Sequence, residues 1–229
     1  EKIREYQKAG HLFGLCTGRQ DGGLTPFITG FVEPDFYITS SGANIVDKDL
    51  NEIRKRGVDP AVAQEILDKY GIENYRFTLD VEGDICVFAP MDYPGKYYVV
   101  KSVADCPKGL IHQVSIHTES LDEAERMAGE INEIWGDSVN AFQNVIEIDI
   151  APKGCSKGKG VEFLREYMRE TYGEIKLYGI GDSINDLPLL EASDVSYTFP
   201  YAPKSVQEKA TKVVETIVDA LEDSMQDMA

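Results

Sequence analysis

The sequence predicts an α/β protein whose parallel-sheet core is interrupted by an inserted α+β module. Near both ends of the chain, short apolar strands alternate with helices, which is typical of a parallel sheet. In the middle, strands are joined by tight turns, which is typical of an antiparallel sheet. The length of 229 residues is also above the usual size of one domain. We therefore expect a core of residues 1–44 and 149–229 and an inserted module of residues 45–148.

The first part of the core is expected to contain a helix and two strands. Residues 1–9 carry apolar side chains at the spacing of one helical face, and Gly10 is a residue that commonly ends a helix. Residues 11–16 (HLFGLC) and 36–39 (FYIT) are short apolar runs of the kind that form buried strands. The order helix, strand, loop, strand is the beginning of a parallel α/β layout.

The inserted module is expected to combine hairpins with helices. Its expected elements, in chain order, are a hairpin at 44–53, a helix at 60–70, strands at 75–79, 84–88 and 110–117, a helix at 121–135 and a strand at 145–150. The segment 93–101, rich in Tyr and Lys, is better explained as a half-buried strand than as a substrate contact. His112 and His117 are five residues apart on one strand and so lie on opposite faces; we interpret them as structural.

The second part of the core returns to alternating helices and strands after Pro152. Residues 152–160 (PKGCSKGKG) form a turn rich in Gly and Lys that opens a helix. The expected elements that follow are a helix at 161–171, a strand at 175–179, a helix at 185–192, a strand at 195–198 and helices at 204–210 and 216–223. This rhythm matches that of the first part, so we expect both parts to share one core.

The charge and the cysteine content restrict the partners and the compartment. Lys and Arg total 23 and Asp and Glu total 40, which gives a net charge of −17 with neutral His. This charge repels a phosphate backbone, so we expect no nucleic-acid partner, and any anionic substrate must meet local cations or a metal.

The four cysteines are far apart in the sequence, which argues against a zinc site or a disulfide scaffold and fits a reducing cytoplasm. No apolar run approaches the roughly 18 residues of a membrane span, so we expect a cytoplasmic protein without a membrane partner.

The stretch 179–186 (GIGDSIND) is the most informative one for chemistry. Asp182 lies just beyond the carboxyl end of a predicted strand, where open α/β sheets bind ligands. Asp186 follows four residues later, so both carboxylates can approach one point. Two carboxylates and an amide oxygen suit a hard cation such as Mg²⁺. The alternative is a capping box formed by Ser183 and Asp186, and the spacing alone favours neither interpretation.

Two other stretches are candidates for phosphate binding. Lys157 lies near the start of a helix, where a cation opposes the helix dipole and makes sense if it faces a bound anion. The tripeptide Thr17-Gly18-Arg19 ends a strand, so its hydroxyl and backbone N–H groups can bind a phosphate oxygen. Taken alone, a solvated lysine and an ordinary helix cap or loop are the simpler explanations of these two stretches.

In this order, the stretches resemble the motifs of the haloacid dehalogenase (HAD) superfamily, specifically of its Cof-like class IIB phosphatases. LCTGR resembles the second motif, whose hydroxyl residue would be Thr17, and SKGKG resembles the third, whose lysine would be Lys157. GIGDSINDLPLL resembles the fourth, metal-binding motif, with Asp182 and Asp186. The resemblance implies a Rossmannoid parallel-sheet core, and it implies that the inserted α+β module is a C2-type cap domain.

The resemblance also implies an activity, a Mg²⁺-dependent phosphatase that hydrolyses a small phosphorylated metabolite through an aspartyl-phosphate. A sugar phosphate or a phosphorylated organic acid is the implied substrate class. The residues that the resemblance assigns to catalysis or to the phosphate are Thr17, Gly18, Arg19, Lys157 and Asn185, and those that it assigns to Mg²⁺ are Asp182 and Asp186. A phosphosugar mutase and a catalytically silent phosphate-binding or regulatory protein are the alternatives.

The sequence departs from the family pattern in three places. Ser41 and Tyr201 stand at positions where the family usually has Asn. The first motif, D-x-D-G-T, carries the family's aspartate nucleophile and general acid/base, and it is not found in the sequence. The similar residues 47–49 (DKD) follow the second motif and lie in a predicted hairpin, so we reject them as a substitute. We therefore expect the 229 residues to be an incomplete representation of the enzyme, with its nucleophile preceding Glu1.

Overall fold

Three sheets form the strand framework of the described residues, which are 1–19, 30–93 and 95–227 of this computed structural model. The first sheet has the order β1 (Gly14–Cys16), β2 (Phe36–Thr39), β3 (Asn44–Asp47) and β4 (Glu52–Lys55). The second has the order β7 (Tyr97–Val99), β6 (Asp84–Val87), β5 (Arg76–Val81), β8 (Ile111–His117), β10 (Glu147–Pro152) and β9 (Val139–Asn144). The third has the order β11 (Tyr178–Ile180), β12 (Val195–Thr198) and β13 (Lys212–Val213).

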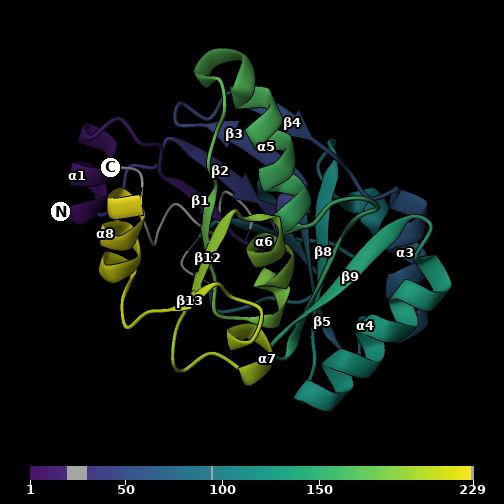
Figure 1. Cartoon of the computed structure of the whole chain (residues 1–229). Helices are drawn as coiled ribbons and strands as arrows, with labels where there is room; N and C mark the ends of the chain where they lie inside the picture. The colour runs from purple at the N-terminus through teal and green to yellow at the C-terminus, as the bar shows by residue number, and fades with distance from the viewer. Residues whose placement is uncertain (20–29, 94, 228–229) are drawn as a thin grey trace.

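Helices flank these sheets (Figure 1). The α-helices are α1 (Lys2–Lys8), α3 (Pro60–Tyr70), α4 (Leu121–Trp135), α5 (Lys157–Tyr172), α6 (Leu187–Ala192), α7 (Lys204–Gln207) and α8 (Ile217–Asp227). The short 3₁₀ turns are η1 (Ser40–Gly42), η2 (Val103–Asp105) and η3 (Ile184–Asp186). No helix in the described ranges is long and apolar enough to cross a membrane.

The first and third sheets supply the parallel strands that the sequence predicts. β1 pairs with β2 in parallel, and β11, β12 and β13 also run parallel to one another. One buried apolar cluster, which includes Ile38 of β2 and Leu164 of α5, joins α5 and α6 to the first sheet. Helices α1 and α8 lie side by side (Figure 1), and Lys2 Nζ is 3.1 Å from a carboxylate oxygen of Glu222. These two sheets and their helices form the predicted α/β core.

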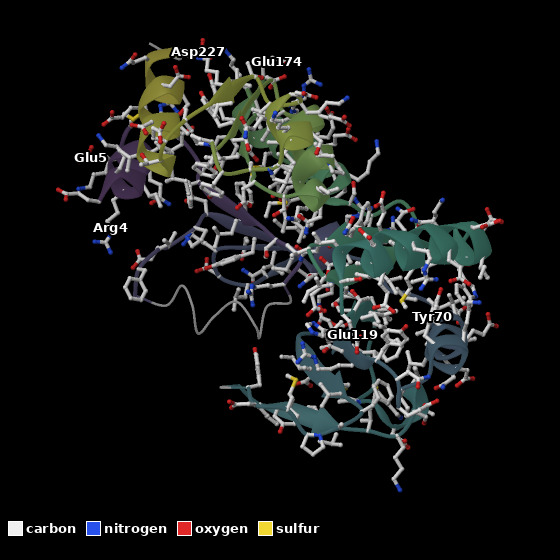
Figure 2. All side chains as sticks on the ribbon, turned by 90° about the horizontal axis from the view of Figure 1, so that it is seen from below. Arg4, Glu5, Tyr70, Glu119, Glu174 and Asp227 are labelled. Carbon is white, nitrogen blue, oxygen red and sulfur yellow. The ribbon has the colours of Figure 1, made fainter. Side chains whose placement is uncertain are left out.

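The second sheet belongs to the inserted module. Its neighbouring strands are antiparallel, except for the parallel pair of β6 and β7. Apolar side chains of α3 and α4 pack with those of β5, β8 and β10 in one large buried cluster, so the helices cover one face of the sheet. In Figure 2, the labelled Tyr70 and Glu119 of this module lie apart from Glu174 and Asp227 of the core. An antiparallel sheet with helices on one face is the α+β architecture that the sequence predicts.

The opposite face of the second sheet carries a group of polar side chains. The strand register places Asp80 opposite Gln113, Thr78 opposite Ser115, and Ser115 opposite Asp149. Directly opposed residues of antiparallel strands point to the same face, so these five side chains share one face. We call them the open face.

Local signals in the sequence start and end the elements of the module. Asp59 caps α3 by accepting a hydrogen bond from the Ala61 N–H at 2.8 Å, and Pro60 takes the first helical position. Glu82 and Gly83 have φ of +53° and +88° and make the tight turn between β5 and β6. The turn at Glu82 and Gly83 therefore helps to set the register of β5 and β6, and with it the side chains that lie on the open face.

Many element boundaries differ from the sequence predictions by a few residues, as for the strand predicted at 175–179, which lies at β11 (Tyr178–Ile180). Two of the differences have a local cause. β9 was not predicted, and the strand predicted at 145–150 lies at β10, because Val145 has φ of +58° and belongs to the turn between the two strands. The helix predicted from residue 161 begins at Lys157, because Ser156 Oγ accepts a hydrogen bond from the Lys159 N–H at 3.1 Å and caps the first turn.

The domain boundaries stay a proposal. The boundary after residue 44 falls within β3, and the boundary before residue 149 falls within β10. Sheet membership instead groups β3 and β4 with the core and all of β10, including Asp149, with the module. Below, the core and the module are named by sheet membership.

We predict that replacing Ile131 with Ala lowers the free energy of unfolding by about 2–5 kcal/mol, because it leaves a cavity in the buried cluster of the module. Ile134→Ala is the matched control, since Ile134 is 49% exposed on the same helix whereas Ile131 is 0% exposed. We expect the control to change stability by less than about 0.5 kcal/mol. Urea denaturation measures both, and equal losses would contradict the packing of α4.

Candidate functional site

The residues predicted for chemistry lie at strand ends and at the start of one helix. Thr17 directly follows β1, Asp182 lies just beyond β11, and Lys157 is the first residue of α5. In an open parallel sheet, ligands bind outside the carboxyl ends of the strands, near the N-termini of the helices. Hydrogen bonds and close approaches join these segments into one polar cluster.

Lys157 is a buried cation held between two side chains. Its side chain is 8% exposed, and Nζ lies 2.5 Å from Asp186 Oδ1 and 3.2 Å from Asn185 Oδ1. A buried charge is stable only when it is paired and hydrogen-bonded, and both conditions are met here. The simpler interpretation of Lys157 as a solvated lysine is therefore wrong.

Asp186 uses both of its carboxylate oxygens inside the protein. Oδ1 accepts from Lys157, and Oδ2 accepts from the backbone N–H groups of Asp182 at 2.9 Å and Ser183 at 3.0 Å. Ser183 and Asp186 thus form the capping box that was one of the two interpretations of their spacing. The bonds of Asp186 fix the backbone that carries Asp182.

Asp182 has the carboxylate that is freest to take a metal ion. Its side chain is partly exposed, and the hydroxyl groups of Ser183, at 3.4 Å, and of Tyr201 contact it. Neither of these partners carries a charge. Within the described ranges, no group of three or more His, Cys, Asp and Glu residues could hold a metal. The Asp182 carboxylate is the kind of oxygen donor that a hard cation binds while it keeps several water ligands.

The tripeptide 17–19, which we call the phosphate loop, packs directly against the inserted module. The Arg19 N–H donates to Thr17 Oγ1 at 3.1 Å, so the hydroxyl hydrogen of Thr17 stays available to a ligand oxygen. The Gly18 carbonyl accepts from Gln113 Nε2 at 2.9 Å. A Cβ on Gly18 would lie 2.5 Å from Asp149 Oδ2, so the loop approaches the module this closely only with glycine at this position.

Asp149 and Gln113, both on the open face, are residues of this cluster that the sequence predictions missed. Each is 4% exposed. Asp149 Oδ1 accepts from Gln113 Nε2 at 3.1 Å, Oδ2 accepts from Asn144 Nδ2 at 3.2 Å, and Asn185 is also hydrogen-bonded to this carboxylate. Burial raises the pKa of Asp149 to about 6, although Lys157 and the hydrogen-bond donors oppose the rise.

A signal for Asp149 is present in the sequence. Residues 146–150 read I-E-I-D-I, an alternation that places Glu147 and Asp149 on one face of a strand and the isoleucines on the other. The alternation does not specify how this strand pairs with β8, and that pairing decides which of its two faces meets the core. Gln113 has a similar but weaker signal, because in residues 111–117 (IHQVSIH) Gln113 and Ser115 alternate with Val114 and Ile116. This alternation predicts the face of the strand but not the contact with the core.

An apolar slot separates the first sheet from the third. Among the described residues, β1 pairs only with β2 and β11 only with β12, so each leaves one strand edge open. A cavity of about 530 Å³ lies between them, lined by both strands and by residues of α5, α6 and α8 that include Val161, Leu189 and Leu221. Buried strand edges need hydrogen-bond partners. The position of the slot and its apolar lining therefore suit a strand that would pair with both β1 and β11 and join the two sheets.

The two positions that depart from the family pattern lie beside the cluster. Ser41 is buried in η1 and has φ of +53°, a left-handed conformation that its neighbours on both sides share. Tyr201 is 71% exposed and stacks on Phe199, with ring centroids 5.1 Å apart. Burial, and then the negative charge and hydrogen bond of Asp182, raise the pKa of Tyr201. Both substitutions therefore keep polar groups next to the predicted site.

The remaining residues singled out in the sequence lie outside the cluster. His112 is buried with Nδ1 2.7 Å from the Arg56 carbonyl oxygen, whereas His117 is half-exposed with Nδ1 2.5 Å from a Glu147 carboxylate oxygen. The strand predicted over 93–101 is shorter, since β7 covers Tyr97–Val99, and residue 94 lies outside the described residues. The four cysteines are free thiols.

Comparison with known proteins decides the family. Residues 1–220 match the family described as haloacid dehalogenase-like hydrolase. The chain belongs to this family. The predicted resemblance to the HAD superfamily is thus confirmed for the chain, and phosphatases of the family generally depend on a metal ion.

Individual HAD relatives are distant in sequence and close in structure. An HMP-PP phosphatase from Citrobacter koseri is 24% identical over 176 residues, which are 72% of this chain and 63% of that protein. The match therefore spans less than two thirds of the relative's length. A haloacid dehalogenase-like hydrolase from B. subtilis has a TM-score of 0.84 and 15% identity, covering 96% of this chain and 90% of the other. The HAD subclass IIB sugar phosphatase BT4131 has a TM-score of 0.75 and 19% identity, covering 99% and 89%. These structures show the fold, a HAD-like α/β core with a cap.

We predict that Asp149 makes the folded chain less stable as the pH rises. Its pKa is about 6 in the folded state against an ordinary 3.8, so the folded state holds the proton more tightly than the unfolded state. The stability from this proton is fully present below the unfolded pKa and is lost as the pH rises to about 6. Between about pH 5 and about pH 8 the loss is on the order of 1 kcal/mol.

Asp149→Asn removes this titration, so the stability of the variant relative to the wild type should increase by that amount over the same pH range. Urea denaturation in the presence of EDTA measures the difference without a contribution from bound metal. A variant and a wild type with the same dependence of stability on pH would show that Asp149 is not the buried carboxyl that the structure places there.

Proposed function

We propose that the complete protein is a Mg²⁺-dependent phosphatase that hydrolyses a small phosphomonoester, either a sugar phosphate or a phosphorylated organic acid. The observation that carries this proposal is one cluster at the carboxyl ends of β1 and β11 that combines a buried lysine, a partly exposed carboxylate and a strand-end hydroxyl. Membership of the haloacid dehalogenase-like hydrolase family supports the reaction class. Relatives named HMP-PP phosphatase and sugar phosphatase support a small phosphorylated substrate.

The phosphate would be held by the phosphate loop and by Lys157. Phosphoryl transfer needs positioning and neutralisation of charge more than covalent assistance from the protein. The Thr17 hydroxyl and the backbone N–H groups of Gly18 and Arg19 would bind phosphoryl oxygens. Lys157 has three N–H donors, and two of them are accounted for by Asp186 and Asn185, which leaves one for the phosphate. Asn185 would act by orienting that ammonium group.

The metal would be held chiefly by Asp182. Its carboxylate would bind Mg²⁺ directly, whereas Asp186, whose oxygens are already bonded, would contribute directly or through a water molecule. When bound, Mg²⁺ neutralises the charge of the phosphoryl oxygens and of the attacking carboxylate. Because the chain has a net charge of −17, an anionic substrate depends on these local positive charges.

The nucleophile would come from a strand outside the 229 residues. An aspartyl-phosphate mechanism needs an aspartate opposite Lys157 and Asp182, and within the part of the chain that the structure describes the strand ends beside them supply none. The slot between β1 and β11 supports this proposal, because a strand inserted there would end between the phosphate loop and Asp182. The D-x-D-G-T motif of the family would stand at that strand end.

The inserted module would act as a cap in the cytoplasmic enzyme. Its open face meets the phosphate loop, so closure of the module would exclude water and leave the polar side chains to select the leaving group. The acidic composition continues to argue against a nucleic-acid partner.

Product analysis separates this function from its rivals. Incubation of the full-length protein with Mg²⁺ and a panel of phosphorylated sugars and organic acids should release inorganic phosphate. Isomerised sugar phosphate without free phosphate would identify a mutase. Binding of Mg²⁺ and phosphate without turnover would identify a regulatory phosphate-binding protein.

We predict that Asp182→Asn in the full-length protein lowers Mg²⁺-dependent hydrolysis of p-nitrophenyl phosphate by about 100-fold or more, because the metal loses its main protein ligand. Release of p-nitrophenol at saturating Mg²⁺ measures the effect. Glu191→Gln, which removes an exposed carboxylate on α6 that pairs with the surface Lys209, is the control and should keep wild-type activity. Full activity in Asp182→Asn would remove the metal assignment.

A further inference from the structure

The phosphate loop is held by a side chain of the inserted module. Gln113 lies on β8, is 4% exposed, and donates from Nε2 to the Gly18 carbonyl at 2.9 Å. The two residues are 95 positions apart in the chain, and the bond crosses from the second sheet to the end of β1. This hydrogen bond therefore couples the position of the module to the geometry of the loop.

The Gly18–Arg19 peptide group is fixed at both ends. Its carbonyl accepts from Gln113, and its N–H donates to Thr17 Oγ1 at 3.1 Å. Because a peptide group is planar, holding the carbonyl also sets the direction of the N–H. The Thr17 hydroxyl accepts that N–H, so its own hydrogen must point elsewhere. Gln113 thus orients the Thr17 hydroxyl through one intervening peptide.

Asp149 fixes the orientation of the Gln113 side chain. Gln113 Nε2 lies 3.1 Å from Asp149 Oδ1, and a carboxylate only accepts hydrogen bonds, so the NH₂ end of the amide must face Asp149 and Gly18. The Gln113 Oε1 atom is buried and has no partner within the described residues. The amide would lose both of these bonds if it were flipped, so Asp149 selects one of its two orientations.

Asp149 also reaches the other side of the cluster. Asn185 is hydrogen-bonded to Asp149, and its Oδ1 accepts from Lys157 Nζ at 3.2 Å. The same carboxylate of the module therefore supports the residues on both sides of the phosphate position, the loop through Gln113 and the lysine through Asn185.

We propose that Gln113 and Asp149 are positioning residues that set the phosphate loop for catalysis, so that the loop is correctly arranged only when the inserted module is seated on the core. This inference rests on the proposed phosphatase function. Neither residue touches the reacting atoms in this arrangement. A purely structural pair would change the stability of the chain and leave the loop and turnover unchanged.

The test replaces Gln113 with Met, which keeps the length of the side chain and removes both N–H donors. Gln113→Leu is a second variant of the same kind, and His117→Gln is the matched control on the same strand, since His117 bonds to Glu147 within the module. Steady-state hydrolysis of p-nitrophenyl phosphate gives kcat and KM. Hydrogen exchange of residues 13–19, followed by mass spectrometry, reports the loop without any need for activity.

We expect Gln113→Met and Gln113→Leu to lower kcat by about tenfold to 100-fold with KM changed by less than about threefold, because a misplaced donor costs more in the transition state than in the bound ground state. We expect the exchange of residues 13–19 to become about tenfold faster in both variants, and both readouts to be unchanged in His117→Gln.

The two readouts separate failure of this inference from failure of the proposed function. Unchanged exchange in folded Gln113→Met and Gln113→Leu would overturn the positioning role, and so would faster exchange with an unchanged kcat. A wild type without turnover would end the phosphatase proposal, and the exchange measurement would still decide whether Gln113 holds the loop. Loss of thermal stability alone, with both readouts at wild-type values, would assign the pair a structural role only.

Discussion

The buried pair of Lys157 and Asp186 connects two segments that lie 29 residues apart in the chain, the start of α5 and the turn after β11. Removing one partner of such a pair leaves an uncompensated buried charge and costs about 3–5 kcal/mol. Asp186 also accepts the backbone N–H groups that precede η3, so the same carboxylate holds the turn on which Asp182 stands. The position of the Asp182 carboxylate therefore depends on the buried ion pair of Lys157 and Asp186.

Much of the contact between the core and the inserted module is polar, although a small apolar cluster also joins them, formed by Ala43, Phe142, Ala151 and Cys155. Gln113 bonds to Gly18, and Ser40 donates to Asp80, whereas the large apolar cluster of the module lies on the far face of its sheet. Polar interfaces between domains are typical of parts that move relative to each other, because water can replace the hydrogen bonds when the parts separate. In the sheet of the module, the face covered by α3 and α4 thus supplies the apolar packing, and the opposite face contacts the core.

Much of the fold follows from local patterns in the sequence. Four elements have the bounds that their sequence patterns predicted, namely β2, α3, α4 and β12. β9 was missed because residues 139–144 (VNAFQN) contain as many polar as apolar side chains, and their place in the sheet depends on pairing with β10. The residues at the ends of β1 and β11 were predictable because strand ends are where such sheets bind ligands. Gln113 and Asp149 were not, because their contact with the core depends on packing between segments far apart in the chain.

The close approach of Asp149 to the backbone of Gly18 links the evolution of the core to that of the module. With 2.5 Å between Asp149 Oδ2 and the place where a Cβ would stand, neither position has room to grow unless the other shrinks. A relative that carries alanine or serine at position 18 should therefore carry a shorter side chain at position 149, and the two columns should co-vary. Substitutions of Asp149 in the module would then occur together with substitutions in the phosphate loop. A module transferred from one relative to another should therefore pack against the core only when the matching loop is transferred with it.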